Sequence, residues 1–121
     1  MRLPSVHGGD FVKLWENPYP NQSFTGEQYI NLPNTDFDYL ILICKSEASG
    51  NTAMPSVIAP KEVGLFVPLA FRQGGTNYSI QRGFTFPTTD YSKIYVGKCW
   101  KNDTNDDSYI IPLQIIGVKY H

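Results

Sequence analysis

The sequence predicts an all-β domain, an antiparallel and jelly-roll-like β-sandwich of about eight strands. Its 121 residues suit a single domain with one core. Hydrophobic residues make up 41% of the chain and charged residues 17%, a balance that supports folding and argues against disorder. Ten glycines and nine prolines are spread among many Tyr, Phe, Thr, Ile and Val residues, which favours short strands joined by tight turns.

In the first half of the chain, strands are expected at residues 11–15, 23–32 and 37–44. Residues 1–10 show no apolar periodicity and are expected to be a linker or the end of a stem, so the sandwich domain would span residues 11–121. Pro18 and Pro20 end the first strand, because proline lacks the donor that a ladder requires. The third strand is continuously apolar after Asp38, which predicts a central strand covered on both faces, followed by a loop at 46–55.

In the second half, strands are expected at residues 56–59, 63–70, 76–86, 92–100 and 109–120. Pro60 and Pro68 interrupt the first two of these, which places them at sheet edges. Gly74 and Gly75 predict the hairpin turn that leads into the strand with the clearest alternation. The polar segment 101–108 is expected to be a solvated loop before the last strand.

Charge and hydropathy exclude two classes of partner. The net charge of −1 leaves no excess of Lys and Arg to neutralise a phosphate backbone or an anionic membrane surface. No run approaches the roughly 18 apolar residues that span a bilayer, and the N-terminal segment lacks the apolar core of a signal peptide. We therefore expect a soluble protein that binds neither nucleic acid nor membrane.

The sequence offers little catalytic or metal-binding chemistry. Both histidines lie at the extremities of the chain, so none is expected within the domain as a base, metal ligand or triad partner. Two cysteines are fewer than small disulfide-dependent domains carry, so Cys44 and Cys99 are expected to be reduced structural thiols, with a disulfide between them as the less favoured alternative. The sequence thus predicts no enzymatic activity, no metal and no cofactor.

The polar loop after Trp100 is the candidate ligand-binding segment. Its acids and amides resemble the opening of a calcium loop, but the Gly and Glu that this motif requires later are replaced by Ser108 and Gln114. A solvated hairpin loop is the favoured interpretation. The alternative is saccharide contact, because an indole face can stack on a sugar while polar groups accept from its hydroxyls. The candidate residues are Trp100, Asn102, Asp103, Asn105, Asp107 and Tyr91.

Two other side chains require interpretation. Arg82 lies on an otherwise apolar face of its predicted strand, where a guanidinium needs an acidic or carbonyl partner. A core network and a subunit interface explain it equally well. Trp15 enters the proline-containing turn and is interpreted as a core residue.

Segments at both ends of the chain resemble one known family. The segments are Leu14-Trp-Glu-Asn-Pro-Tyr-Pro20 with the following Phe24 and Gln28, Asp38-Tyr-Leu-Ile-Leu-Ile43, and Ile111-Pro-Leu-Gln-Ile-Ile-Gly-Val-Lys119. They resemble the C-terminal domain of tail-fibre and minor tail proteins, which are receptor-binding proteins of phages and prophages of Gram-positive bacteria. The resemblance covers about residues 11–120 and is loose at 46–62 and 101–108.

This resemblance implies a domain at the virion tail, made in the bacterial cytoplasm, that adheres to a host cell-surface glycan within a homotrimer. The motif residues themselves look structural, so the resemblance carries no ligand-binding residue to this chain. The alternative is a structural tail or baseplate domain whose aromatics, among them Tyr91 and Tyr95, contact other tail proteins. A wall-degrading enzyme is a third hypothesis with no catalytic residues to support it.

Overall fold

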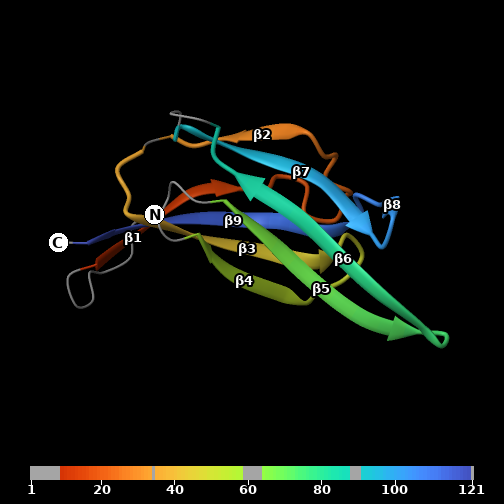
Figure 1. Ribbon diagram of the computed structural model, residues 1–121. Helices are drawn as coiled ribbons and strands as arrows, with labels where there is room; N and C mark the ends of the chain where they lie inside the picture. Colours follow the sequence, from red (N-terminus) through yellow and green to blue (C-terminus); the bar gives the residue numbers. More distant parts are fainter. Residues whose placement is uncertain (1–8, 34, 59–63, 88–90, 121) are drawn as a thin grey trace.

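In the computed structural model, the chain forms two antiparallel sheets packed face to face (Figure 1). The structure describes residues 9–33, 35–58, 64–87 and 91–120, which contain no helix. The strands are β1 (Gly9–Glu16), β2 (Gln28–Asn31), β3 (Tyr39–Glu47), β4 (Ala53–Ile58), β5 (Leu65–Gln73), β6 (Thr76–Thr85), β7 (Lys93–Lys101), β8 (Thr104–Asn105) and β9 (Tyr109–Tyr120). The predicted sandwich is confirmed. The two-residue β8 is the one strand that was not among the eight expected from the sequence.

The two sheets have different connectivity. The first sheet has the order β1-β9-β3-β4, and the second has the order β2-β7-β6-β5 with β8 paired to β7. The first three strands alternate between the sheets, as in a jelly roll, whereas β5, β6 and β7 are consecutive neighbours. The edge positions predicted for the proline-containing strands are confirmed, since β4 and β5 each end a sheet, while Pro60 itself lies outside the described residues. Their prolines, Pro55 and Pro68, are tolerated there because an edge strand leaves backbone donors unpaired.

Three strand boundaries differ from the sequence predictions. β1 begins at Gly9, which pairs with Tyr120, so residues 9 and 10 belong to the sandwich and not to a linker, while residues 1–8 lie outside the described part. The β3–β4 pairing extends to Lys45 and Ala53, which shortens the predicted loop at 46–55. At β2 the strand is shorter than predicted because Glu27 has a φ of 63°, which is incompatible with extended backbone.

The hydrophobic core lies between the sheets. On β3, Leu40, Leu42 and Cys44 are fully buried, whereas Ile41 and Ile43 on the opposite face are only partly buried. The prediction of a strand covered on both faces is therefore wrong for the described residues. A sandwich of two layers leaves each sheet one outer face, however apolar the strand is.

A β-bulge in β7 decides which side chains reach the core. Strict alternation would place Val96 and Trp100 on one face and Cys99 on the other. In the structure Phe84 pairs with Val96 and Arg82 pairs with Cys99, so β7 has one more residue than β6 over this interval. The extra residue turns Cys99 inward and Trp100 outward, where the indole is 41% exposed.

Both cysteines face the core and are free. Burial raises the pKa of Cys44 to about 12 and that of Cys99 to about 11, although the nearby Arg82 charge opposes both shifts. The protonated thiols behave as small apolar side chains. This arrangement matches the prediction of reduced structural thiols.

The two terminal motifs meet in the fold. β1 pairs with β9, and just beyond β1 the Asn17 backbone N–H donates to the Leu113 carbonyl at 2.8 Å. The Asn17 side chain donates through Nδ2 to the Pro112 carbonyl at 2.8 Å and accepts through Oδ1 from the Tyr19 N–H at 2.8 Å. The Asn-Pro and Ile-Pro elements therefore form one buried clasp between the first and last strands.

Candidate functional site

The structure separates the predicted ligand-binding residues into two places. Trp100, Asn102, Asp103, Asn105 and Asp107 lie in or beside the β7–β8 hairpin. Tyr91 precedes the other end of β7, where the strand alone separates Lys93 from Trp100 by roughly 23 Å at about 3.3 Å per residue. Its ring packs edge-on against Phe86 at a centroid distance of 5.4 Å. Tyr91 is therefore not part of one site with the other five.

Asp107 is part of a structural network. Its Oδ1 accepts from Arg82 Nη2 at 2.8 Å and from the Cys99 N–H and Asn105 Nδ2 at 2.9 Å, and its Oδ2 accepts from the Gly26 N–H at 2.9 Å. Burial alone would raise the pKa of Asp107, but these hydrogen bonds and the Arg82 charge together lower it below its usual value. Its oxygens hold the hairpin against the core, and ligand contact by Asp107 stays a prediction.

The Arg82 side chain forms a core network within the chain. It is completely buried, and it donates to the Phe24 carbonyl at 2.8 Å and the Ile110 carbonyl at 3.3 Å as well as to Asp107. The guanidinium also lies 5.9 Å from the centre of the Phe24 ring. Of the two interpretations of Arg82, the core network is the one that the contacts support.

The rest of the hairpin is only partly available to a ligand. Asn102 Oδ1 accepts from the Ser79 N–H at 2.9 Å, and Asn105 Nδ2 donates to the Cys99 carbonyl at 2.9 Å in addition to its bond with Asp107. Asp103 and Trp100 are exposed. Among the described residues, no group of His, Cys, Asp and Glu is placed to hold a metal ion.

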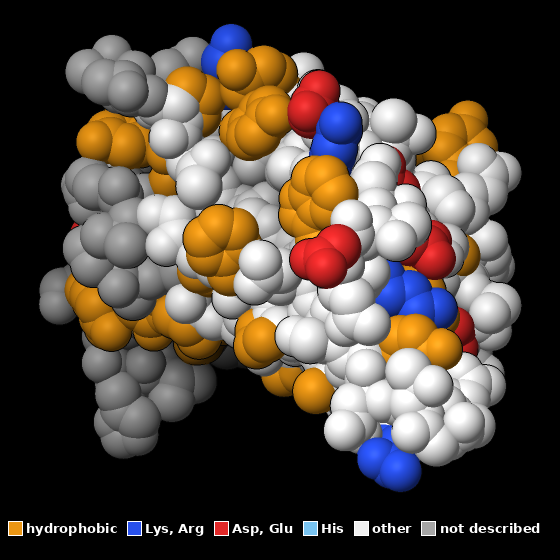
Figure 2. Space-filling model, turned by 45° about the vertical axis from the view of Figure 1, so that its right-hand side comes forward, with side chains coloured by type: hydrophobic (Ala, Val, Ile, Leu, Met, Phe, Trp, Pro, Cys, Tyr) orange, Lys and Arg blue, Asp and Glu red, His pale blue; other side chains and the backbone are white. Residues whose placement is uncertain are grey.

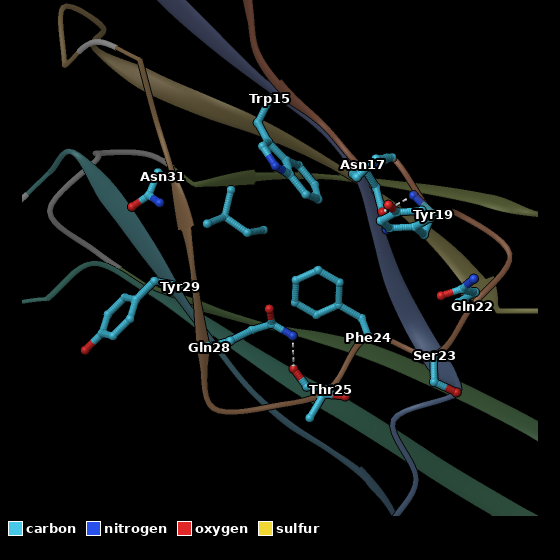
Figure 3. A pocket seen from close by; sticks show the side chains of 12 residues that line it. Trp15, Asn17, Tyr19, Gln22, Ser23, Phe24, Thr25, Gln28, Tyr29 and Asn31 are labelled. Carbon is cyan, nitrogen blue, oxygen red and sulfur yellow. Dashed lines mark hydrogen bonds between the residues drawn. The ribbon is translucent and has the colours of Figure 1, made fainter.

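A cavity of about 420 Å³ lies between the end of β1, the strand β2 and the segment that joins them. This segment, residues 17–27, crosses from the first sheet to the second. Figure 3 shows Trp15, Phe24 and Gln28 pointing into this space, whereas Tyr29 points away from it. Trp15 and Phe24 pack edge to face with ring centroids 6.3 Å apart. The lining residues are Trp15, Asn17, Pro18, Tyr19, Gln22, Ser23, Phe24, Thr25, Gln28, Tyr29, Ile30 and Asn31.

The cavity combines aromatic walls with an uncharged polar rim. None of its twelve lining residues is Asp, Glu, Lys, Arg or His. Gln28 Nε2 donates to the Thr25 carbonyl, which orients the amide at the entrance. Apolar walls with a few directed polar groups are typical of small-molecule sites, and the absence of charge from the lining disfavours anions and metal ions as ligands. A neutral molecule with several hydroxyls matches this lining.

The sequence interpretation missed this cavity, because its residues lie in the N-terminal motif that was interpreted as structural. Trp15 does contribute to the core, as predicted, and its edge also reaches the cavity. A signal was present in the sequence. Residues 17–31 combine two prolines and several aromatics with many Asn, Gln, Ser and Thr residues and only one acid.

The outer face of the sheet β1-β9-β3-β4 carries a different kind of surface. Ile41 pairs with Val57 on one side and Ile116 on the other, so these side chains and that of Ile43 share the outer face. Val57 is 55% exposed and the isoleucines are partly buried. We call Ile41, Ile43, Val57 and Ile116 the aliphatic face.

In the part of the chain that the structure describes, no helix has the length and apolar character needed to cross a bilayer. Comparisons of the chain with protein-family models, with curated proteins and with solved structures find no match.

Proposed function

We propose that this domain binds a neutral saccharide on the surface of a bacterial host, as a receptor-binding domain at the tail of a phage or prophage virion. The observation that carries the proposal is the uncharged cavity with Trp15 and Phe24 in its walls. Aromatic rings pack against the C–H groups of a sugar, while amides and hydroxyls exchange hydrogen bonds with its hydroxyl groups. The resemblance of the terminal segments to tail proteins supports the location.

The arrangement favours binding without catalysis. The cavity lining includes no carboxylate pair, no histidine and no thiol, so the hydroxyls of Ser23 and Thr25 have no general base among the lining residues to activate them. A single site of this size would bind a sugar weakly. Display of several copies on one virion, as in the trimer that the resemblance implies, raises the overall avidity without new contacts.

The test is a Gln28→Ala substitution. Gln28 is exposed at the cavity entrance, so the substitution leaves the core intact. It removes one side-chain amide of the protein that would hydrogen-bond to the ligand. We expect a two- to tenfold loss of affinity, because one hydrogen bond contributes about 0.5–1.5 kcal/mol. Calorimetric titration with glucose, galactose, rhamnose, N-acetylglucosamine, N-acetylgalactosamine and their disaccharides measures the change.

The matched control is Gln73→Ala, which removes the same exposed side chain from a residue outside this cavity. The control should bind these sugars like the wild type. Equal affinities of the two variants, or no binding of any of these sugars by the wild type, would refute the assignment of the cavity.

A second candidate function is assembly without a ligand, and the aliphatic face favours it. Its exposed apolar side chains are of the kind that protein interfaces bury. On this hypothesis the face packs against a second copy of the chain or another tail protein. Sedimentation velocity decides between a monomer and a self-associating protein.

A further inference from the structure

The outer face of the sheet β2-β7-β6-β5 carries three exposed aromatic side chains. Tyr29 is 49% exposed, Phe66 69% and Trp100 41%. Each is next in sequence to a buried residue of the same strand, which places the aromatic side chain on the outer side: Ile30, Val67 and Cys99 respectively. Within the described part of the chain, three of the six exposed large hydrophobic side chains thus belong to one sheet face.

Two glycines, Gly83 and Gly97, lie between these aromatic side chains. Gly83 on β6 and Gly97 on β7 occupy neighbouring positions, and a Cβ added to Gly97 would approach only the Gly83 backbone, at 3.6 Å. The Phe66 ring lies beside Gly83, where an added Cβ would come within 3.0 Å of it. The Phe66 ring therefore covers Gly83, and the backbone left uncovered by side chains within contact distance is that of Gly97.

The face is longer than one sugar unit and borders the edge strand β2. Tyr95 and Trp100 lie opposite Thr85 and Gln81, which are four residues apart on β6, or roughly 13 Å. At the other end the Tyr29 and Tyr95 rings pack with centroids 5.4 Å apart. Tyr29 also contributes to the cavity lining, but its ring points away from the cavity (Figure 3), so the strand β2 lies between the two surfaces.

The charges on this face are compensated locally. Lys98 Nζ lies 3.6 Å from Glu27 Oε1, and Lys93 Nζ lies 4.7 Å from the centre of the Tyr29 ring. Exposed polar side chains, Gln81 and Thr85, stand between the aromatic positions. Figure 2 shows hydrophobic side chains separated by polar atoms, with basic and acidic side chains adjacent between them. This alternation suits a neutral polyhydroxylated chain, whereas the continuous aliphatic face of the other sheet suits a protein.

We propose that Tyr29, Phe66, Tyr95 and Trp100, here called the aromatic platform, bind successive units of a linear neutral polysaccharide. The inference rests on the proposed function and extends it from a single sugar to a polymer. Stacking on several rings along the strands would give affinity that increases with chain length.

The experiment measures affinity against chain length. Purified protein is titrated with gluco-, galacto- and N-acetylglucosamine oligosaccharides of increasing length, from monosaccharides to long oligomers. For the wild type, affinity should rise about tenfold or more with length, and Trp100→Ala should remove most of that rise, because a buried aromatic contact contributes on the order of 1 kcal/mol or more. Binding of the shortest sugars should stay unchanged in this variant.

Two further variants make the test specific. Gly97→Gln places a side chain over the sheet backbone between the aromatic rings. It should reduce long-chain binding without removing a ring. Tyr120→Ala removes an exposed aromatic from the other sheet and should have no effect. Thermal unfolding confirms that each variant is folded.

The outcomes separate the two proposals. Affinity that does not depend on length, equal losses in Trp100→Ala and Tyr120→Ala, or no binding of any oligosaccharide overturns the aromatic platform. Length-dependent binding that Trp100→Ala weakens and Gln28→Ala leaves unchanged supports the platform and refutes the cavity. Short-sugar binding that only Gln28→Ala weakens supports the cavity alone.

Discussion

At the scale of single residues, the most consequential contact joins Arg82 and Asp107. The sequence pattern identified Arg82 as a charge in need of a partner, but the partner lies 25 residues away in a loop that looked solvated. Desolvating a guanidinium is costly unless a nearby charge and hydrogen bonds compensate it. The network thereby ties the β7–β8 hairpin to the core.

The corresponding prediction concerns Asp107→Ala. The substitution leaves Arg82 buried without its counter-charge, so we expect a loss of about 3–5 kcal/mol in the free energy of unfolding at pH 7. Urea denaturation measures the loss. The control is Asp103→Ala in the same hairpin, where the exposed carboxylate should contribute less than about 0.5 kcal/mol.

The Arg82–Asp107 pair also predicts how the free energy of unfolding depends on pH. The folded pKa of Asp107 lies below its unfolded value of about 3.9, so its stabilising contribution is complete above that pH and is lost as the pH falls through the folded pKa. The difference between wild type and Asp107→Ala should therefore shrink in strongly acidic solution. A difference that grows on acidification contradicts the role assigned to Asp107.

At the scale of elements, the clasp at Asn17 connects the first and last strands. Its amide satisfies the Pro112 carbonyl, and its oxygen caps the turn through the Tyr19 N–H. No local pattern reveals such a bond, because the two partners are 95 residues apart in sequence. The resemblance marked both segments, and the structure supplies a physical reason for their association.

We predict that Asn17→Ala lowers the free energy of unfolding by about 1–3 kcal/mol, because it leaves the buried Pro112 carbonyl without a donor. Thermal and urea unfolding measure the effect. Asn51→Ala, in the exposed loop between β3 and β4, serves as the control and should be nearly neutral. Equal stabilities of the two variants would exclude a clasp at Asn17.

At the scale of the whole molecule, the two outer faces of the sandwich differ in the side chains that they present. The aromatic platform alternates rings with polar groups, and the aliphatic face presents neighbouring branched side chains from three strands. A tail domain that binds a glycan and also assembles would use both faces at once, since they lie on opposite sides of the sandwich.

The prediction at this scale concerns Val57→Asp. A charge at this exposed position should change the stability of the monomer little, but it would be buried in any complex formed through the aliphatic face. If that face mediates assembly, sedimentation velocity should show an oligomer for the wild type and a monomer for the variant. The control Ser79→Asp, on the outer face of the other sheet, should sediment like the wild type. A wild type that stays monomeric at all concentrations argues against assembly of copies through this face.

Several features of this protein followed from its sequence alone: the all-β class, the edge strands with proline and the Gly74–Gly75 hairpin. These depend on local alternation and on residues with restricted or permissive backbones, and both act within a few positions of the chain. The turn is an example, since Gly74 and Gly75 adopt φ values of 59° and 79° that other residues rarely adopt.

Only the tertiary structure decided which residues could form a site. The bulge in β7 turned Trp100 outward, the Arg82 network engaged Asp107, and the crossover after β1 brought Trp15 and Phe24 together around a cavity. Each of these depends on pairings between distant segments, which strand periodicity does not encode. The candidate residues therefore moved from one polar loop to a cavity and a sheet face, because burial and register, rather than residue type, determine which polar and aromatic groups are free to bind.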